Sequence, residues 1–315
     1  MVRAKMESNP TTEGPDFLCI GMGKAGTGWI YDQCQHHPDF WMPPIKEIHY
    51  LDREFPRRTP GRTLKRPVDV AQAKREKQGK RRLEERDYVF MREMAAFKGQ
   101  PMDLERYAAM FRFKGNQLSG DVTPSYGAIE EDIVARVMTR FPHLKIFLML
   151  RDPVSRAWSH FSMKHRGAKI PTATLREPDK FREMLATSKV TVTGSPAQIY
   201  RKWIRHVPTE NFRYYFFEDL MSDPKVVSED VLRFLGCDPA RNPVDAARNR
   251  KAEKPKIEIT EDIRAILAEH FADEILDSAE IFGGHAATWP AKYGLTRRGG
   301  AERNTSAALS SPAPG

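Results

Sequence analysis

A glycine-rich turn that contains one lysine is the first stretch of this sequence that could do chemistry. Residues 21–28 read Gly-Met-Gly-Lys-Ala-Gly-Thr-Gly and follow a short apolar run at residues 17–20. Glycines let a backbone approach a ligand closely, and the N–H groups at the start of a helix attract negative charge. Lys24 adds a full positive charge. The pattern predicts an anion-binding loop between a buried strand and a helix, although taken alone it also fits a surface turn with a solvated lysine.

Two common nucleotide-binding patterns fit this loop poorly. A magnesium nucleotide loop carries its lysine after the last glycine and just before Ser or Thr, whereas Lys24 precedes the Gly-Thr pair. Gly21, Gly23 and Gly26 match the dinucleotide pattern, but that pattern needs a second strand ending in an acidic residue about 20 residues later. Adjacent prolines at residues 43–44 disfavour such a strand. Neither a magnesium nucleotide nor a dinucleotide is therefore the favoured ligand.

A second cationic group is expected at the end of another buried strand. The run at residues 146–150 is apolar at every position, as in a central parallel strand, and Arg151 and Asp152 follow it. Ligands of open α/β sheets bind at the carboxyl ends of strands, so we expect Lys24 and Arg151 to face one crevice. The alternative for Arg151 is an ordinary ion pair with Asp152.

Alternating strands and helices must position these residues. Apolar periodicity predicts one helix from residue 29 to 37, another from 153 to about 165, and a strand at 212–217 that lies between further helices. A chain that alternates in this way builds a parallel sheet covered by helices. The expected fold class is therefore α/β.

The composition is that of one globular domain. Of the 315 residues, 40% are hydrophobic, and no run approaches the roughly 18 apolar residues of a membrane span. We expect one domain from residue 16 to 295 between disordered ends at 1–15 and 296–315. The three cysteines have neither disulfide nor zinc spacing, which favours a reducing cytoplasm.

Most of the formal charge of +9 lies in one stretch. Residues 53–86 hold 13 Lys and Arg against five Asp and Glu, a net of +8. One interpretation is a basic flap that holds an acidic acceptor, and the other, which we favour, is a solvated and partly helical insert. No aromatic residue interrupts residues 57–86, so the stacking surfaces of a single-strand nucleic-acid binder are missing. We expect no nucleic-acid partner.

With these pieces in order, the chain resembles the sulfotransferases that use 3′-phosphoadenosine 5′-phosphosulfate (PAPS). It is most similar to the bacterial and carbohydrate-type branch related to heparan sulfate sulfotransferases. The resemblance runs from about Asp16 to Trp289 and implies a P-loop-like three-layer fold with a mainly parallel sheet. It rests on three motifs in the family's order, at residues 23–27 (Gly-Lys-Ala-Gly-Thr), 46–50 (Lys-Glu-Ile-His-Tyr) and 151–159 (Arg-Asp-Pro-Val-Ser-Arg-Ala-Trp-Ser).

The resemblance implies how the donor would be held. Lys24 and the backbone of the loop would bind the 5′-phosphosulfate, while Arg151 and Ser159 would bind the 3′-phosphate. An arginine suits this role because its guanidinium offers a phosphate two parallel hydrogen bonds. A basic loop matches the family's donor-covering loop in composition only. The implied donor-binding residues are Gly23, Lys24, Ala25, Gly26, Thr27, Gly28, Arg151, Ser159, Arg248, Arg250 and Lys251.

The resemblance also implies the catalytic residues. Glu47 would be the general base that takes the acceptor proton, with His49 nearby to orient or assist it. Lys24 would stabilise the charge that grows on the bridging oxygen as adenosine 3′,5′-bisphosphate (PAP) leaves. The acceptor would be a hydroxyl, or in second place an amine, of a small molecule, lipid or glycan. No metal is required.

One departure from the family keeps two rival hypotheses open. Heparan-type members have Glu-Lys before Thr-Pro-Ser-Tyr, whereas this chain has Asp121-Val122, so a lysine near the sulfate is absent. Lys46 or a basic residue of the 53–86 insert would have to replace it. The missing lysine is the main support for a non-catalytic nucleotide-binding module. The other rival, a phosphotransferase, is disfavoured by the order of residues in the loop.

Overall fold

Four parallel strands form the centre of the protein. The structure is a computed structural model that describes residues 13–52, 67–97, 99–188, 195–243, 245 and 257–297. The strands are β1 (Phe17–Gly21), β2 (Gly120–Val122), β3 (Lys145–Leu150) and β4 (Phe212–Phe216). Their spatial order is β2-β1-β3-β4, and every pairing is parallel. The predicted α/β fold with a parallel central sheet is confirmed.

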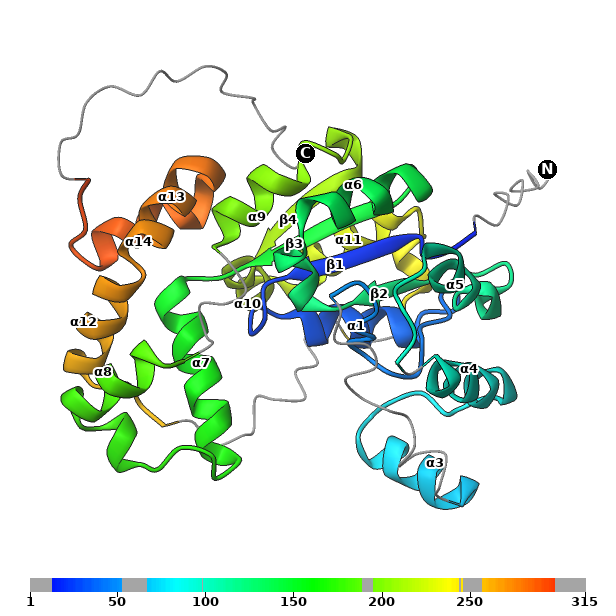
Figure 1. Ribbon diagram of the computed structural model, residues 1–315, viewed down its shortest axis with the longest axis horizontal. Helices are drawn as coiled ribbons and strands as arrows, with labels where there is room; N and C mark the ends of the chain where they lie inside the picture. The colour runs from blue at the N-terminus through cyan, green and yellow to red at the C-terminus, as the bar shows by residue number, and fades with distance from the viewer. Residues whose placement is uncertain are drawn as a thin grey trace.

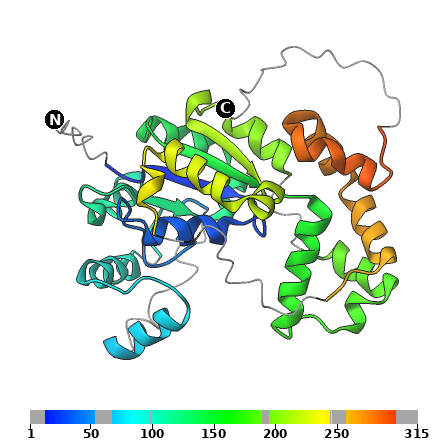
Figure 2. The ribbon, with the colours of Figure 1, turned by 180° about the vertical axis from the view of Figure 1, so that it is seen from behind.

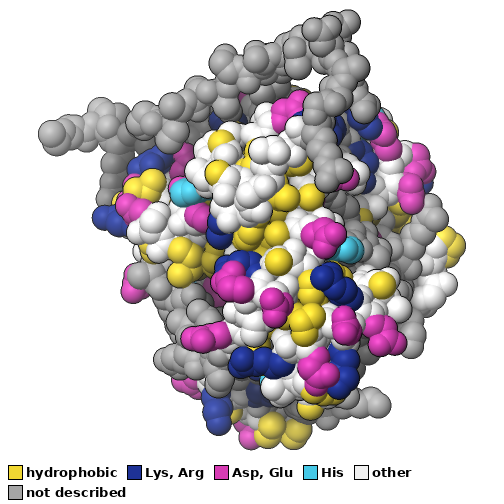
Figure 3. All heavy atoms as spheres, turned by 90° about the vertical axis from the view of Figure 1, so that its left-hand side faces the viewer, with side chains coloured by type: hydrophobic (Ala, Val, Ile, Leu, Met, Phe, Trp, Pro, Cys, Tyr) yellow, Lys and Arg dark blue, Asp and Glu magenta, His cyan; other side chains and the backbone are white. Residues whose placement is uncertain are grey.

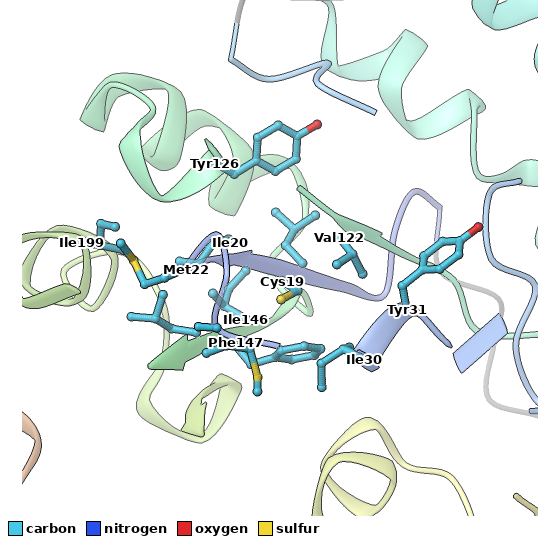
Figure 4. Packing of buried hydrophobic residues seen from close by; sticks show 14 of the residues in the cluster. Cys19, Ile20, Met22, Ile30, Tyr31, Val122, Tyr126, Ile146, Phe147 and Ile199 are labelled. Carbon is cyan, nitrogen blue, oxygen red and sulfur yellow. The ribbon is translucent and has the colours of Figure 1, made fainter. Parts of the chain in front are cut away.

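Helices cover both faces of this sheet (Figures 1 and 2). One face carries α1 (Thr27–His36) and α11 (Pro224–Leu235), and the other carries α6 (Glu131–Arg140), α9 (Pro196–Trp203) and the short turn η2 (Pro124–Ala128). Figure 4 shows Phe147 toward Ile30 of α1, and Ile20 toward Ile199 of α9 on the opposite side. Because both faces are covered, β1 is buried at every position, which explains its continuous apolar run.

A second group of helices lies beyond the carboxyl ends of the strands. It consists of α7 (Pro153–Arg166), α8 (Pro178–Ala186), α12 (Glu261–His270), α13 (Ala272–Phe282) and α14 (Gly284–Lys292). Helix α7 follows β3 after two residues, and α12 packs against both α7 and α8. Figure 3 looks onto this side, where acidic and basic side chains are interspersed with apolar ones. Neither sign of charge dominates the part of this face that the structure describes.

The remaining elements that the structure describes are four helices and four single turns. They are the helices α3 (Val68–Lys77), α4 (Glu85–Ala96), α5 (Leu104–Ala109) and α10 (Phe217–Ser222), and the single turns η1 (Arg112–Lys114), η3 (Ala173–Leu175), η5 (Thr209–Asn211) and η6 (Pro239–Arg241). In the described part of the chain, no helix is long and apolar enough to cross a membrane. Residues 1–12 and 298–315, which include most of the two expected disordered ends, lie outside the described residues.

The sequence did not predict every element. Strand β2 is only three residues long and includes Gly120 and Asp121, two residue types that are depleted in strands. The strand expected at 212–217 ends one residue early, because Phe217 begins α10.

The sequence predicts a solvated basic insert at 53–86. For some of the residues that the structure describes in this stretch, that prediction is wrong. Residues 53–66 lie outside the described residues, but Arg75 and Arg81 of the remainder are not solvated. Arg75 is buried and donates to the Pro44 carbonyl oxygen over 3.2 Å. Arg81 donates two hydrogen bonds of 2.6 Å to the carboxylate of Asp87, which is fully buried. This part of the basic stretch is therefore attached to the domain.

We expect Arg81→Met to lower the free energy of unfolding by about 3 kcal/mol, because it leaves a buried carboxylate without its charged partner. Asp87 would keep the hydrogen bond of 3.0 Å from the Trp41 indole, but not its charge balance. Urea denaturation would measure the loss. Arg82→Met, at the exposed neighbouring position, is the matched control and should change stability little. Equal stability of the two variants would contradict a structural role for Arg81.

Candidate functional site

The glycine-rich loop joins β1 to α1 at the carboxyl end of the sheet. Gly26 is the residue before the first turn of α1, has φ of 101°, and provides no side chain to cap the helix. This positive φ favours glycine, and a Cβ atom there would also stand 2.8 Å from Leu220 Cδ2, so that the leucine side chain would have to shift. The first N–H groups of α1 therefore start at an uncapped turn beside Lys24, as an anion site requires.

A lysine connects the loop to the segment that follows α1. Lys46 Nζ lies 3.4 Å from Thr27 Oγ1 and 2.8 Å from Glu47 Oε1. The ammonium group thus contacts the first residue of α1 and the predicted general base at once. Two motifs that are separated by about 20 residues in the sequence come together at this point.

Behind Glu47 stands a chain of polar side chains. His49 Nε2 is 3.9 Å from Glu47 Oε2, and His49 Nδ1 is 2.6 Å from Asp52 Oδ2. Since a carboxylate only accepts, the His49 Nδ1–H donates to Asp52, and Nε2 faces Glu47. The hydroxyl of Ser125 also donates to Asp52. His49 is buried, so this arrangement fixes both its orientation and its tautomer.

The backbone is strained at the residues that were expected to be catalytic. Four non-glycine residues in the described part of the chain have positive φ, and three of them are Lys24 (72°), Glu47 (64°) and His49 (59°). The left-handed region is unfavourable for residues with a Cβ, and such strain gathers at functional sites, where the surrounding structure holds it in place. This observation supports the choice of these three residues independently of their chemistry.

A buried carboxylate holds residues 46–50, the base segment, from behind. Asp121 accepts hydrogen bonds from the hydroxyls of Tyr126 (2.7 Å), Tyr107 (3.1 Å) and Thr123 (2.6 Å). The Tyr126 hydroxyl in turn accepts from the backbone N–H of Tyr50 over 2.9 Å. Burial raises the pKa of Asp121 above its usual value, and the three donors oppose that shift. The residue after His49 is thereby tied to β2.

Arg151 brings the third motif to the loop. Its Nη1 donates to the carbonyl oxygen of Lys24 over 2.9 Å, and its guanidinium carbon lies 4.1 Å from the ring centroid of Phe217. Burial lowers the pKa of Arg151, with Glu218 and Asp152 opposing the shift. This contact places Arg151 beside the backbone of Lys24.

Ser159 lies on α7, on the side of the loop. It is half-buried. Lys24 Nζ reaches Met163 Sδ at 3.5 Å, and Met163 lies one helical turn beyond Ser159, so the two share a face of α7. Burial, Lys164 and Lys24 together lower the pKa of His160 to about 4, so that His160 is neutral at pH 7.

The other predicted donor-binding residues, Arg248, Arg250 and Lys251, lie outside the described residues. The chain resumes at Ile257, whose carbonyl oxygen accepts a hydrogen bond of 2.9 Å from the Trp158 indole. Trp158 is the neighbour of Ser159, so the described chain resumes beside the α7 face.

At Val122 the structure gives a physical reason for the missing lysine. Val122 pairs with Cys19 in the sheet and is 2% exposed, so a lysine on this backbone would have to bury its charge or leave the core. Lys46 is the basic residue found between the loop and Glu47.

Sequence reasoning missed Asp52 and the positioning role of Asp121. The only available signal was their nearness in sequence to His49 and to the Thr-Pro-Ser-Tyr stretch.

One group of potential metal ligands occurs among the described residues, and it lies elsewhere. A ring nitrogen of His37, a carboxylate oxygen of Asp39 and Cys237 Sγ lie within 4.8 Å of one another. This group follows the last turn of α1, whereas the loop precedes the first, and a helix of 10 residues separates the two. Arg241 already forms an ion pair with Asp39. The group is therefore not part of the candidate site.

Comparisons with known proteins point in one direction. A family model described as the sulfotransferase family matches residues 15–241. Heparan sulfate glucosamine 3-O-sulfotransferase 3B1 of Homo sapiens is 29% identical over 225 residues, 70% of this chain and 46% of that protein. Heparan sulfate glucosamine 3-O-sulfotransferase 6 of Mus musculus is 25% identical over 227 residues, 70% of this chain and 52% of that protein. The chain thus spans about half the length of these curated relatives.

The fold also matches a solved structure. A sulfotransferase from Alicyclobacillus acidocaldarius superposes with a TM-score of 0.56 at 23% identity, covering 87% of this chain and 98% of that one.

We expect Tyr126→Phe to loosen the base segment without unfolding the protein. The change leaves the Tyr50 N–H without its acceptor and Asp121 with one donor fewer, so stability should fall by about 1–3 kcal/mol. Hydrogen exchange at residues 50 and 51 should become faster. Tyr215→Phe, which removes a hydroxyl bonded to Asp230, is the control and should leave that exchange unchanged. Unchanged exchange in Tyr126→Phe would show that the hydroxyl does not hold the segment.

Proposed function

This chain belongs to the sulfotransferase family, and on that premise we propose that it transfers a sulfuryl group from PAPS to an acceptor hydroxyl. The observation that carries the proposal is the position of Lys46, whose ammonium group contacts Thr27 of the loop and Glu47 together. The contact supports a single site in which donor and general base meet.

The residues present fit a donor with two phosphate groups. The uncapped start of α1 and Lys24 would hold the 5′-phosphosulfate. Arg151, fixed against the loop by its bond to the Lys24 carbonyl oxygen, would bind the 3′-phosphate with part of its five N–H donors, assisted by Ser159. The basic loop is still proposed to cover the donor with Arg248, Arg250 and Lys251.

In the proposed reaction, the acceptor oxygen gives its proton to Glu47 and attacks sulfur in line with the leaving group. A new O–S bond forms as the bond between sulfur and the bridging oxygen breaks, and that electron pair leaves with PAP. Lys24 stabilises the charge on the bridging oxygen. His49, whose Nδ1 is held by Asp52, stands behind Glu47, and its Nε2 can accept the proton in turn. The cations of this chain supply the positive charge, so the mechanism requires no metal.

Heparan-type relatives have a lysine at the position of Val122, and in this proposal the role of that lysine is taken over by Lys46. Its ammonium group already lies beside the loop, where negative charge on the sulfuryl oxygens would develop. This contact weakens the case for a non-catalytic module, which rested on the missing lysine.

Among hydroxyl acceptors, the names of the curated relatives favour a glycan over a small molecule or lipid. We also propose a cytoplasmic location, because the three cysteines are buried and unpaired.

The first prediction of this proposal concerns ligand selectivity. PAP should raise the melting temperature without magnesium, since binding to the native state adds about 2.7 kcal/mol at 100 times the dissociation constant. ATP and NAD should do much less, because neither carries separate 5′ and 3′ phosphate groups on one ribose. Thermal denaturation with each ligand tests this, and an equal shift with NAD would return the loop to the dinucleotide class.

The second concerns the chemistry. Glu47→Gln cannot accept a proton, so turnover should fall by about 10² to 10⁴ while PAP affinity holds. Lys24→Ala should lower turnover by about 10² or more and weaken PAP binding as well. Turnover with labelled donor and calorimetry with PAP separate the two effects.

Lys225→Ala, an exposed lysine on α11, is the control and should change neither quantity. A Glu47→Gln enzyme with most of its rate would transfer the base role to His49, and normal rate and binding in Lys24→Ala would refute the assignment of the loop.

A further inference from the structure

An acidic residue stands directly beside the arginine that is proposed to bind the 3′-phosphate. Asp152 follows Arg151 in the chain, and a carboxylate competes with a phosphate for a guanidinium because both accept the same pair of hydrogen bonds. In the described part of the chain, however, no ion pair joins the two residues. Arg151 instead donates to the Lys24 carbonyl oxygen and stacks on Phe217.

The Asp152 carboxylate is occupied by other partners. Its Oδ1 accepts from the Ser155 N–H over 3.1 Å and caps α7. Its Oδ2 accepts from Lys292 Nζ and from the Tyr293 hydroxyl, both at 2.6 Å. Asp152 is 2% exposed, whereas the Lys292 side chain is 46% exposed. Both oxygens are thus turned toward α7 and the end of α14.

These partners come from a distant part of the chain. Lys292 is 140 residues from Asp152 in sequence, and the family model ends at residue 241. The last helices return to the α7 side of the molecule, which brings the end of α14 to the start of α7 (Figure 1). Burial and the Asp152 carboxylate raise the pKa of Tyr293, so its hydroxyl remains a donor.

We propose that Lys292 and Tyr293 are positioning residues of the donor site: they hold the Asp152 carboxylate away from Arg151 and so keep the guanidinium for the 3′-phosphate of the donor. The inference rests on the proposed function, since it assumes that Arg151 binds that phosphate. It makes residues beyond the family-matched region part of the donor site.

Charge supports the assignment as well as geometry. An unneutralised buried carboxylate would repel a 3′-phosphate and attract Arg151, and both effects would weaken binding of the donor. Lys292 neutralises the carboxylate with a charged hydrogen bond, and Tyr293 adds a neutral one. Loss of either residue should therefore lower the affinity for ligands that carry a 3′-phosphate, but not for ligands that lack it.

The test compares two ligands that differ only in that group. Calorimetry would measure the affinities of PAP and of adenosine 5′-monophosphate for the whole protein, and their ratio isolates the 3′-phosphate. In Lys292→Met the ratio should fall about tenfold, the size of one pKa unit of charge interaction, while the affinity for the monophosphate holds. Tyr293→Phe should lower the ratio less.

A second substitution separates positioning from simple structural support. Asp152→Asn keeps the helix cap, because Asn caps as well as Asp, but removes the competing charge. The ratio should therefore be restored in Lys292→Met/Asp152→Asn. Lys202→Met, which removes a lysine that donates to the Ile129 carbonyl oxygen, is the matched control and should not change it.

The outcomes distinguish the two proposals. If the unmodified protein does not prefer PAP, the donor assignment itself fails. If it does, but the ratio survives in Lys292→Met or is not restored in the double variant, the positioning role is overturned. Should Lys292→Met not fold, Tyr293→Phe with and without Asp152→Asn gives the same comparison.

Discussion

A single buried carboxylate, Asp121, organises the back of the site. Hydroxyls from three surrounding positions donate hydrogen bonds to it. One of them, on Tyr126, also accepts a hydrogen bond from the backbone N–H of Tyr50. An unsatisfied buried carboxylate is costly, so each donor has one strongly preferred position, and the groups that these donors hold are placed with them. The base segment has no regular secondary structure and depends on such side-chain bonds for its shape.

The parts of the site that could be predicted are those that have a short, local sequence pattern. The loop around Lys24 combines a buried strand, glycines and a helix start, and all three leave a local trace in the sequence. Arg151 could be placed because an apolar run before it identifies a strand, and parallel strands place their carboxyl ends at one edge. The resemblance to sulfotransferases added Glu47 and His49, whose residue types alone would also fit a surface ion pair.

The parts that could not be predicted are those set by pairing across long distances. Ser125 and Asp52 are 73 residues apart, and Lys292 and Asp152 are 140 apart, so no periodicity or spacing reveals them. The prediction that the basic stretch at 53–86 is solvated was wrong in part for the same reason. Arg81 has the same side chain as its exposed neighbour Arg82, but it binds the buried Asp87 and the Met42 carbonyl oxygen.

The positive φ angles at Lys24, Glu47 and His49 have a consequence for the evolution and engineering of this fold. A left-handed backbone costs a residue with a Cβ roughly 1–2 kcal/mol, a cost that glycine does not bear. Selection for thermal stability alone would therefore favour glycine at the three positions whose side chains are proposed to act in the reaction. Under that proposal, stability and activity are opposed at these sites, and variants selected for heat resistance would include fewer active enzymes.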